Sequence, residues 1–171
     1  MNLALSEVST QNILSQLEES GQKTLGLLSQ ESIAFTHSNL SHMLNSTTIK
    51  SATGKVAKCQ IENGLSRYII FISLDSQNVY PFIKNYYTAD EITSDVCGEW
   101  SCEILNMITG DLIGHFANVE SIKFSGEIPS LVETPLNIKG LSQNNLIGSF
   151  GLVNDNNFSL EIYFNLTASR N

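Results

Sequence analysis

The residues best suited to chemistry are two carboxylates, an amide and a glycine, at Glu99, Glu103, Asn106 and Gly110. In a helix, with roughly 100° between neighbours, these four positions fall on one face within about 60°. An asparagine amide can hold an attacking water with one donor and one acceptor, although it cannot serve as a general base at neutral pH. The spacing therefore predicts a site that positions water to hydrolyse a phosphoryl group carried by a partner.

Two of these residues are unfavourable for a helix. Asn is a poor helix former, and Gly110 costs about 1 kcal/mol relative to alanine in a helix interior. Their presence on one stripe suggests that this helix gives up some stability so that another molecule can approach it closely. The alternative is an amphipathic helix whose solvated face has no function, and the pattern alone leaves that alternative open.

A long helix over residues 89–116 is expected to present this stripe. Thr88 and Glu91 have the spacing of a capping box at its start. Trp100 is expected in the core, with an interface anchor as the alternative. The apolar residues that should face the core are Ile92, Val96, Trp100, Ile104, Leu105, Ile108, Leu112 and Phe116.

The remaining pattern predicts an α+β fold in which helices cover an antiparallel sheet. Helices are expected at residues 10–28 and 78–87, and Asn63-Gly64 marks a hairpin turn. Strands are expected at residues 32–36, 47–62, 68–74, 121–127, 146–153 and 158–166, the last two as a hairpin. No repeat or linker divides the chain, so residues 1–171 are expected to form one domain.

Composition narrows the possible partners. The chain has 171 residues, 42% of them hydrophobic and 15% charged, with a net charge of −8. This balance favours a globular protein and disfavours nucleic acid or an anionic membrane as a partner. The three cysteines form no CxxC pair, and we see no leader or membrane span. We therefore expect free thiols, no metal site and a cytoplasmic location.

The spacing around Asn106 resembles the active-site pattern of the CheC/CheX/FliY chemotaxis phosphatases. That pattern is Asp or Ser, three residues, Glu, two residues, Asn, then twenty-two residues and Pro. Glu103, Asn106 and Pro129 match it, and Glu99 stands at the first position. A single copy of the Glu-x-x-Asn motif makes the chain similar to CheX and unlike CheC, which has two.

The resemblance implies that Asn106 holds the hydrolytic water and that Glu103 pairs with a lysine of a phosphorylated CheY-type receiver domain. It implies no cofactor on this chain, because Mg²⁺ would belong to the receiver domain of that response regulator. It also implies a homodimer, for which we expect the terminal hairpin to offer an open sheet edge. Two alternatives are a non-catalytic module that binds receiver domains and a structural dimer in which Glu103 and Asn106 are ordinary surface.

Overall fold

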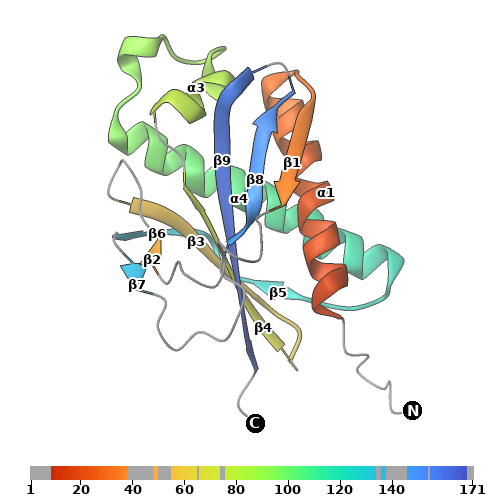
Figure 1. Ribbon diagram of the computed structural model, residues 1–171. Helices are drawn as coiled ribbons and strands as arrows, with labels where there is room; N and C mark the ends of the chain where they lie inside the picture. The colour runs from red at the N-terminus through yellow and green to blue at the C-terminus, as the bar shows by residue number, and fades with distance from the viewer. Residues whose placement is uncertain are drawn as a thin grey trace, which may run out of the picture.

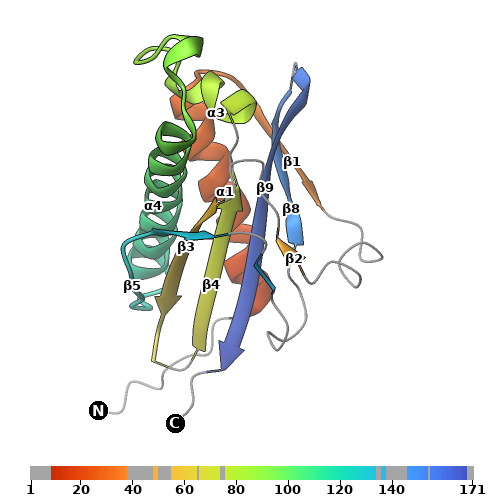
Figure 2. The same cartoon turned by 90° about the vertical axis from the view of Figure 1, so that its left-hand side faces the viewer.

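The computed structural model describes most of the chain. The described residues are 9–37, 48–49, 55–64, 66–73, 76–133, 136–137, 146–153 and 155–168. Figure 1 shows an antiparallel sheet with helices behind it, and the turned view in Figure 2 shows that α1 and α4 lie on the same face. The predicted α+β architecture is therefore confirmed.

The main sheet has the strand order β1-β8-β9-β4-β3-β5 within the described residues, and β6 also pairs with β3. A separate ladder joins β2 to β7. The strands are β1 (Ile33–His37), β2 (Thr48–Ile49), β3 (Lys55–Glu62), β4 (Ser66–Ser73), β5 (Ser125–Gly126), β6 (Ser130–Glu133), β7 (Leu136–Asn137), β8 (Leu146–Leu152) and β9 (Asp155–Ala168).

The terminal hairpin is present, but its expected place at a sheet edge is wrong. β8 and β9 pair with each other, β8 also pairs with β1, and β9 also pairs with β4. Both strands therefore lie inside the sheet. The alternating pattern indicates a strand, but it does not specify which other strands will pair with its edges.

Three α-helices are described, and two of them cover the sheet. α1 (Thr10–Ser29) packs on α4 (Ser94–Val119), and α4 packs on β3. The shorter α3 (Ser76–Ile83) lies near the start of α4, as Figure 2 shows. No helix among the described residues is both long and apolar enough to span a bilayer.

The long helix begins later than the sequence suggested. Thr88 and Glu91 do form the predicted capping box, but it closes only a short 3-10 turn at Ala89–Glu91. α4 starts after Thr93, whose hydroxyl accepts a hydrogen bond from the Val96 amide at 3.3 Å. This second N-cap sets the start of α4.

One side of α4 forms the centre of the core. Ile104, Leu105, Ile108 and Leu112 are fully buried, as the apolar pattern predicted. Trp100 differs, because it is only partly buried and packs at the margin of the core against Tyr86, with ring centroids 5.8 Å apart. The face of α4 opposite this core is left to solvent.

The chain after α4 also departs from the prediction. A strand was expected over residues 121–127, but only Ser125–Gly126 pairs, and β6 follows at Ser130–Glu133. Ser121 has a left-handed φ of 55°, and the Ile122 amide donates to the Phe116 carbonyl at 3.0 Å. This turn reverses the chain and uses residues that sequence pattern assigned to a strand.

Candidate functional site

Glu99, Glu103, Asn106 and Gly110 all lie exposed on the outer side of α4, as their spacing predicted. We call these four residues the polar stripe. The buried residues of α4 occupy the opposite side of the helix, which fixes the direction in which the stripe faces. The prediction that these four residues lie exposed on one side of a helix is confirmed.

The polar side chains of the stripe are available for a partner. No described residue forms an ion pair or a side-chain hydrogen bond with Glu99, Glu103 or the Asn106 amide. Two carboxylates one turn apart without a bound cation attract a positive charge from outside. An amide beside them keeps both its donor and its acceptor for a bound molecule.

Gly110 is not required by packing within this chain. A methyl group built at Gly110 meets no atom within 4 Å. At Gly98, by contrast, a methyl group would come within 2.8 Å of the end of the Leu131 side chain, which would have to shift to admit it. Gly110 instead leaves bare helix backbone beside Asn106, open to close approach from outside.

Residues 122–131, which we call the return segment, run back along one flank of α4. Gly126 lies against Ile113, and Leu131 lies against Gly98. The segment is therefore antiparallel to the helix and passes the level of Asn106 between these two contacts. Pro129 is buried on this stretch, three residues after Gly126 and two before Leu131.

This path explains the long gap between Asn106 and Pro129. Residues 107–119 carry the helix about 20 Å beyond Asn106 at 1.5 Å per residue. After the turn at Ser121 the chain runs back along the helix, with Gly126 against Ile113 and Leu131 against Gly98. The residues between Asn106 and Pro129 therefore take the chain to the end of α4 and back along the side of the helix.

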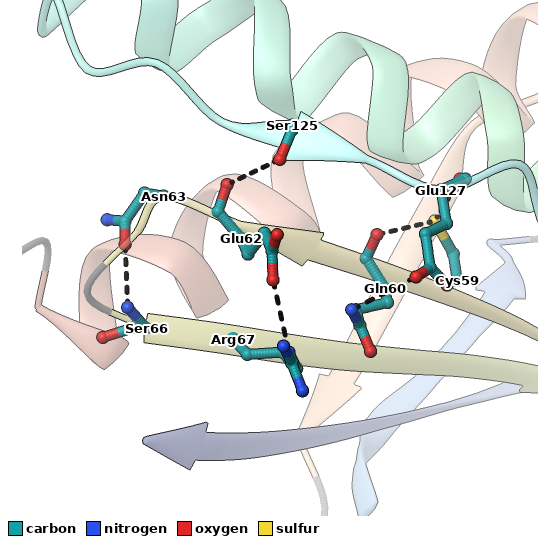
Figure 3. Close-up of polar contacts among 8 residues, drawn as sticks. All are labelled: Cys59, Gln60, Glu62, Asn63, Ser66, Arg67, Ser125 and Glu127. Carbon is teal, nitrogen blue, oxygen red and sulfur yellow. Dashed lines mark hydrogen bonds and ion pairs between the residues drawn. The ribbon is translucent and has the colours of Figure 1, made fainter. Parts of the chain in front are cut away.

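Two residues of β3 fix the return segment at Glu127, as Figure 3 shows. The Glu127 amide donates to the Gln60 carbonyl at 2.9 Å, and the Gln60 side chain donates to the Glu127 carboxylate at 3.3 Å. The Cys59 sulfur lies 3.3 Å from the Glu127 carbonyl oxygen and 3.8 Å from the Thr109 hydroxyl on α4. Cys59 therefore links the segment and the helix.

Burial keeps the Cys59 thiol in its protonated form. Cys59 is 2% exposed, and desolvation raises the pKa of its thiol above the ordinary value. A protonated thiol is a hydrogen-bond donor, which suits its position beside the Glu127 carbonyl. Sequence reasoning missed Cys59, Gln60 and Thr109, because only long-range pairing brings them to the return segment.

A second polar contact ties α4 to α1. Asp111 forms an ion pair with Lys23 and accepts a hydrogen bond from the buried Ser20 hydroxyl at 2.8 Å. The Lys23 contact is the main reason that the pKa of Asp111 lies below its ordinary value. This bridge helps set the position of α4, and with it the direction of the stripe.

The described residues contain no cluster of three or more His, Cys, Asp or Glu side chains that could hold a metal ion. Cys59, Cys97 and Cys102 are free thiols, as expected. The polar stripe itself presents two carboxylates and one amide on α4.

Comparison with protein families finds no match to this sequence, and comparison with curated proteins finds none either. Solved structures, however, share its fold. CheX from Vibrio vulnificus aligns at a TM-score of 0.67 and 12% identity, and CheX from Desulfovibrio desulfuricans at 0.65 and 14%. Each alignment covers 91% of this chain and 99% of the other.

A third structure is a complex of CheX with CheY, BeF3 and Mg²⁺ from Borrelia burgdorferi. Its alignment has a TM-score of 0.58 and 11% identity, and covers 90% of this chain and 97% of the matched chain. The fold of this protein is therefore the CheX/CheC-like fold, as the resemblance of the sequence implied.

Proposed function

We propose that this chain is a CheX-like member of the CheC/CheX/FliY phosphatases and hydrolyses the aspartyl phosphate of a CheY-type receiver domain. The main support is the position of Glu103 and Asn106, exposed one turn apart on α4 with no partner among the described residues. The fold adds support, because a CheX with the same fold has been crystallised with CheY. The proposal places the chain in the cytoplasm with its substrate.

In the proposed reaction, water attacks the phosphorus of the acyl phosphate. The new P–O bond forms as the bond to the receiver's aspartate breaks, so the products are inorganic phosphate and a free carboxylate. The Asn106 carbonyl oxygen accepts a hydrogen bond from the water and its amide NH₂ donates toward the phosphoryl oxygens. Because phosphoryl transfer has a loose transition state, alignment and charge balance supply most of the catalysis.

Glu103 has a different role in this scheme. Its carboxylate pairs with a lysine ammonium of the receiver domain and so fixes the orientation of the phosphoryl group above Asn106. Mg²⁺ belongs to the receiver domain in this proposal and balances the charge of the phosphoryl group. The residues of this chain then need only to align the water and the partner.

The test is the loss of the phosphoryl group from purified CheY-type receiver domains, phosphorylated with acetyl phosphate and then freed of it. Wild type should accelerate this loss, and Asn106→Ala should reduce the acceleration by about 100-fold, the usual cost of one positioning contact. Tight binding of a phosphorylated receiver without hydrolysis would instead favour the non-catalytic binding module. Equal activity of wild type and Asn106→Ala would contradict the assigned mechanism.

A further inference from the structure

Exposed apolar side chains lie on both sides of the polar stripe. Ile128 is 89% exposed, and it belongs to the return segment along one flank of α4. Tyr86 is 69% exposed on the other flank, where it packs on Trp100, the neighbour of Glu99. Large exposed apolar side chains therefore border the polar stripe on two sides.

The backbone on both sides of Ile128 is fixed, while its side chain is exposed to solvent. The residue before it, Glu127, is fixed through both its backbone amide and its carbonyl by Gln60 and Cys59. The residue after it, Pro129, is buried. An apolar side chain on such a restrained backbone loses little further entropy when a partner covers it.

The aromatic pair on the other flank is also anchored. The Tyr86 amide donates to the Ile83 carbonyl at 2.8 Å, which fixes Tyr86 at the end of α3. The ring of Trp100 comes from the first turns of α4 and belongs to the margin of the core. Tyrosine and tryptophan are the residue types most enriched among the anchors of protein interfaces.

We infer that Ile128 and the Tyr86–Trp100 pair are the two apolar contacts by which this chain seats the phosphorylated receiver domain, one on each side of the stripe. This inference rests on the proposed function. Charge favours this occupant, because Glu99 and Glu103 have no cation among the described residues and attract one from a partner. A receiver domain that carries a lysine next to its phosphoryl group supplies that positive charge.

The first test compares the kinetics of three variants on a phosphorylated receiver domain. Ile128→Ala and Tyr86→Ala should each raise KM by about tenfold and leave kcat unchanged, since an apolar interface anchor contributes more than 1 kcal/mol. Val119→Ala is the matched control. Val119 is 68% exposed, lies about 20 Å from Asn106 along the same helix, and should leave both constants unchanged.

A second test needs no variant. Trp100 is the sole tryptophan of the chain, so labelling with 5-fluorotryptophan gives one ¹⁹F NMR signal next to the stripe. Titration with a receiver domain loaded with Mg²⁺ and BeF3 should shift or broaden that signal. The same receiver without BeF3 should do so only at higher concentration.

The outcomes separate this inference from the proposed function. If wild type hydrolyses the phosphorylated receiver while Ile128→Ala and Tyr86→Ala keep the wild-type KM, the apolar contacts are wrong and the phosphatase stands. A ¹⁹F signal unmoved by a receiver that the chain dephosphorylates would have the same meaning. If wild type neither binds nor dephosphorylates any receiver domain, both proposals are overturned.

Discussion

At position 110, alanine would serve the helix better than the glycine that is present. A methyl group there meets no atom within 4 Å, and the same is true of Gly114 one turn later. Neither glycine is explained by close packing inside the chain. Gly110 differs from Gly114 in standing on the exposed stripe next to Asn106, where a receiver domain would approach the helix backbone most closely.

Gly110→Ala should therefore raise stability and lower activity. The free energy of unfolding should increase by about 0.5–1 kcal/mol, because alanine restricts the unfolded chain and favours helix. Phosphatase activity should fall, because the added methyl group would stand on the surface proposed to receive the partner. Gly114→Ala is the control, with a similar gain in stability and wild-type activity. Chemical denaturation and receiver dephosphorylation measure the two effects, and equal activities would refute the close approach.

Substitutions of Glu103 and of Asn106 should affect different kinetic constants. Glu103→Ala removes a charge-assisted contact to the partner, so KM should rise about tenfold or more while kcat changes less. Glu103→Gln, which retains the shape but not the charge, should show most of the same loss. Steady-state kinetics on one phosphorylated receiver would decide this. A fall in kcat alone would mean that Glu103 acts on the reacting atoms and not in docking.

Among the elements, α4 sets the direction of the stripe and the bridge to α1 helps to hold it. The stripe could be predicted from sequence because helix periodicity is local: the spacing of Ile104, Leu105 and Ile108 defines the buried side and hence the exposed one. The start of α4 was misplaced because Thr88 and Thr93 both offer N-cap chemistry. Only the folded chain shows that the first closes a separate turn.

The bridge from Lys23 to Asp111 predicts a pH dependence of stability. Since the hydrogen bond from Lys23 lowers the pKa of Asp111 in the folded protein, its contribution is complete above the unfolded pKa of about 4. The contribution is lost as pH falls through the lower folded pKa. Asp111→Asn should therefore cost at most about 1 kcal/mol at neutral pH, and this cost should vanish in acid.

Urea denaturation of wild type and Asp111→Asn at neutral and at strongly acidic pH measures this difference. The Asn side chain can still accept from Ser20, so the variant isolates the charge from the hydrogen bond. A difference in unfolding free energy that stays constant with pH would show that Asp111 contributes through packing and not through its charge.

At the scale of the whole molecule, the strand order could not be predicted from the sequence. Each strand is a local pattern, but the neighbours of β8 and β9 depend on contacts across the entire chain. The same is true of the return segment, because its path beside α4 depends on the pairing of β5 and β6 with β3. The residues of the stripe were therefore predictable, while the contacts of the buried Cys59 and the positions of Tyr86 and Ile128 beside the stripe were not.

The expected homodimer remains a prediction at this scale, but its proposed surface has to change. Because β8 and β9 are interior strands, the open sheet edge must be sought elsewhere, and β1 is one end of the described strand order. A dimer with a roughly micromolar dissociation constant corresponds to about 8 kcal/mol of association free energy. Light scattering across a concentration series should show twice the monomer mass, and a monomer at high concentration would contradict it.

Counting turnovers tests most directly whether this chain is a catalyst. A phosphorylated receiver domain in large excess over wild type should release many phosphate ions per chain, well above its own spontaneous rate. Asn106→Ala, with an unchanged fold, should approach that spontaneous rate. Release of no more than one phosphate per chain, or identical release with and without the protein, would contradict the account.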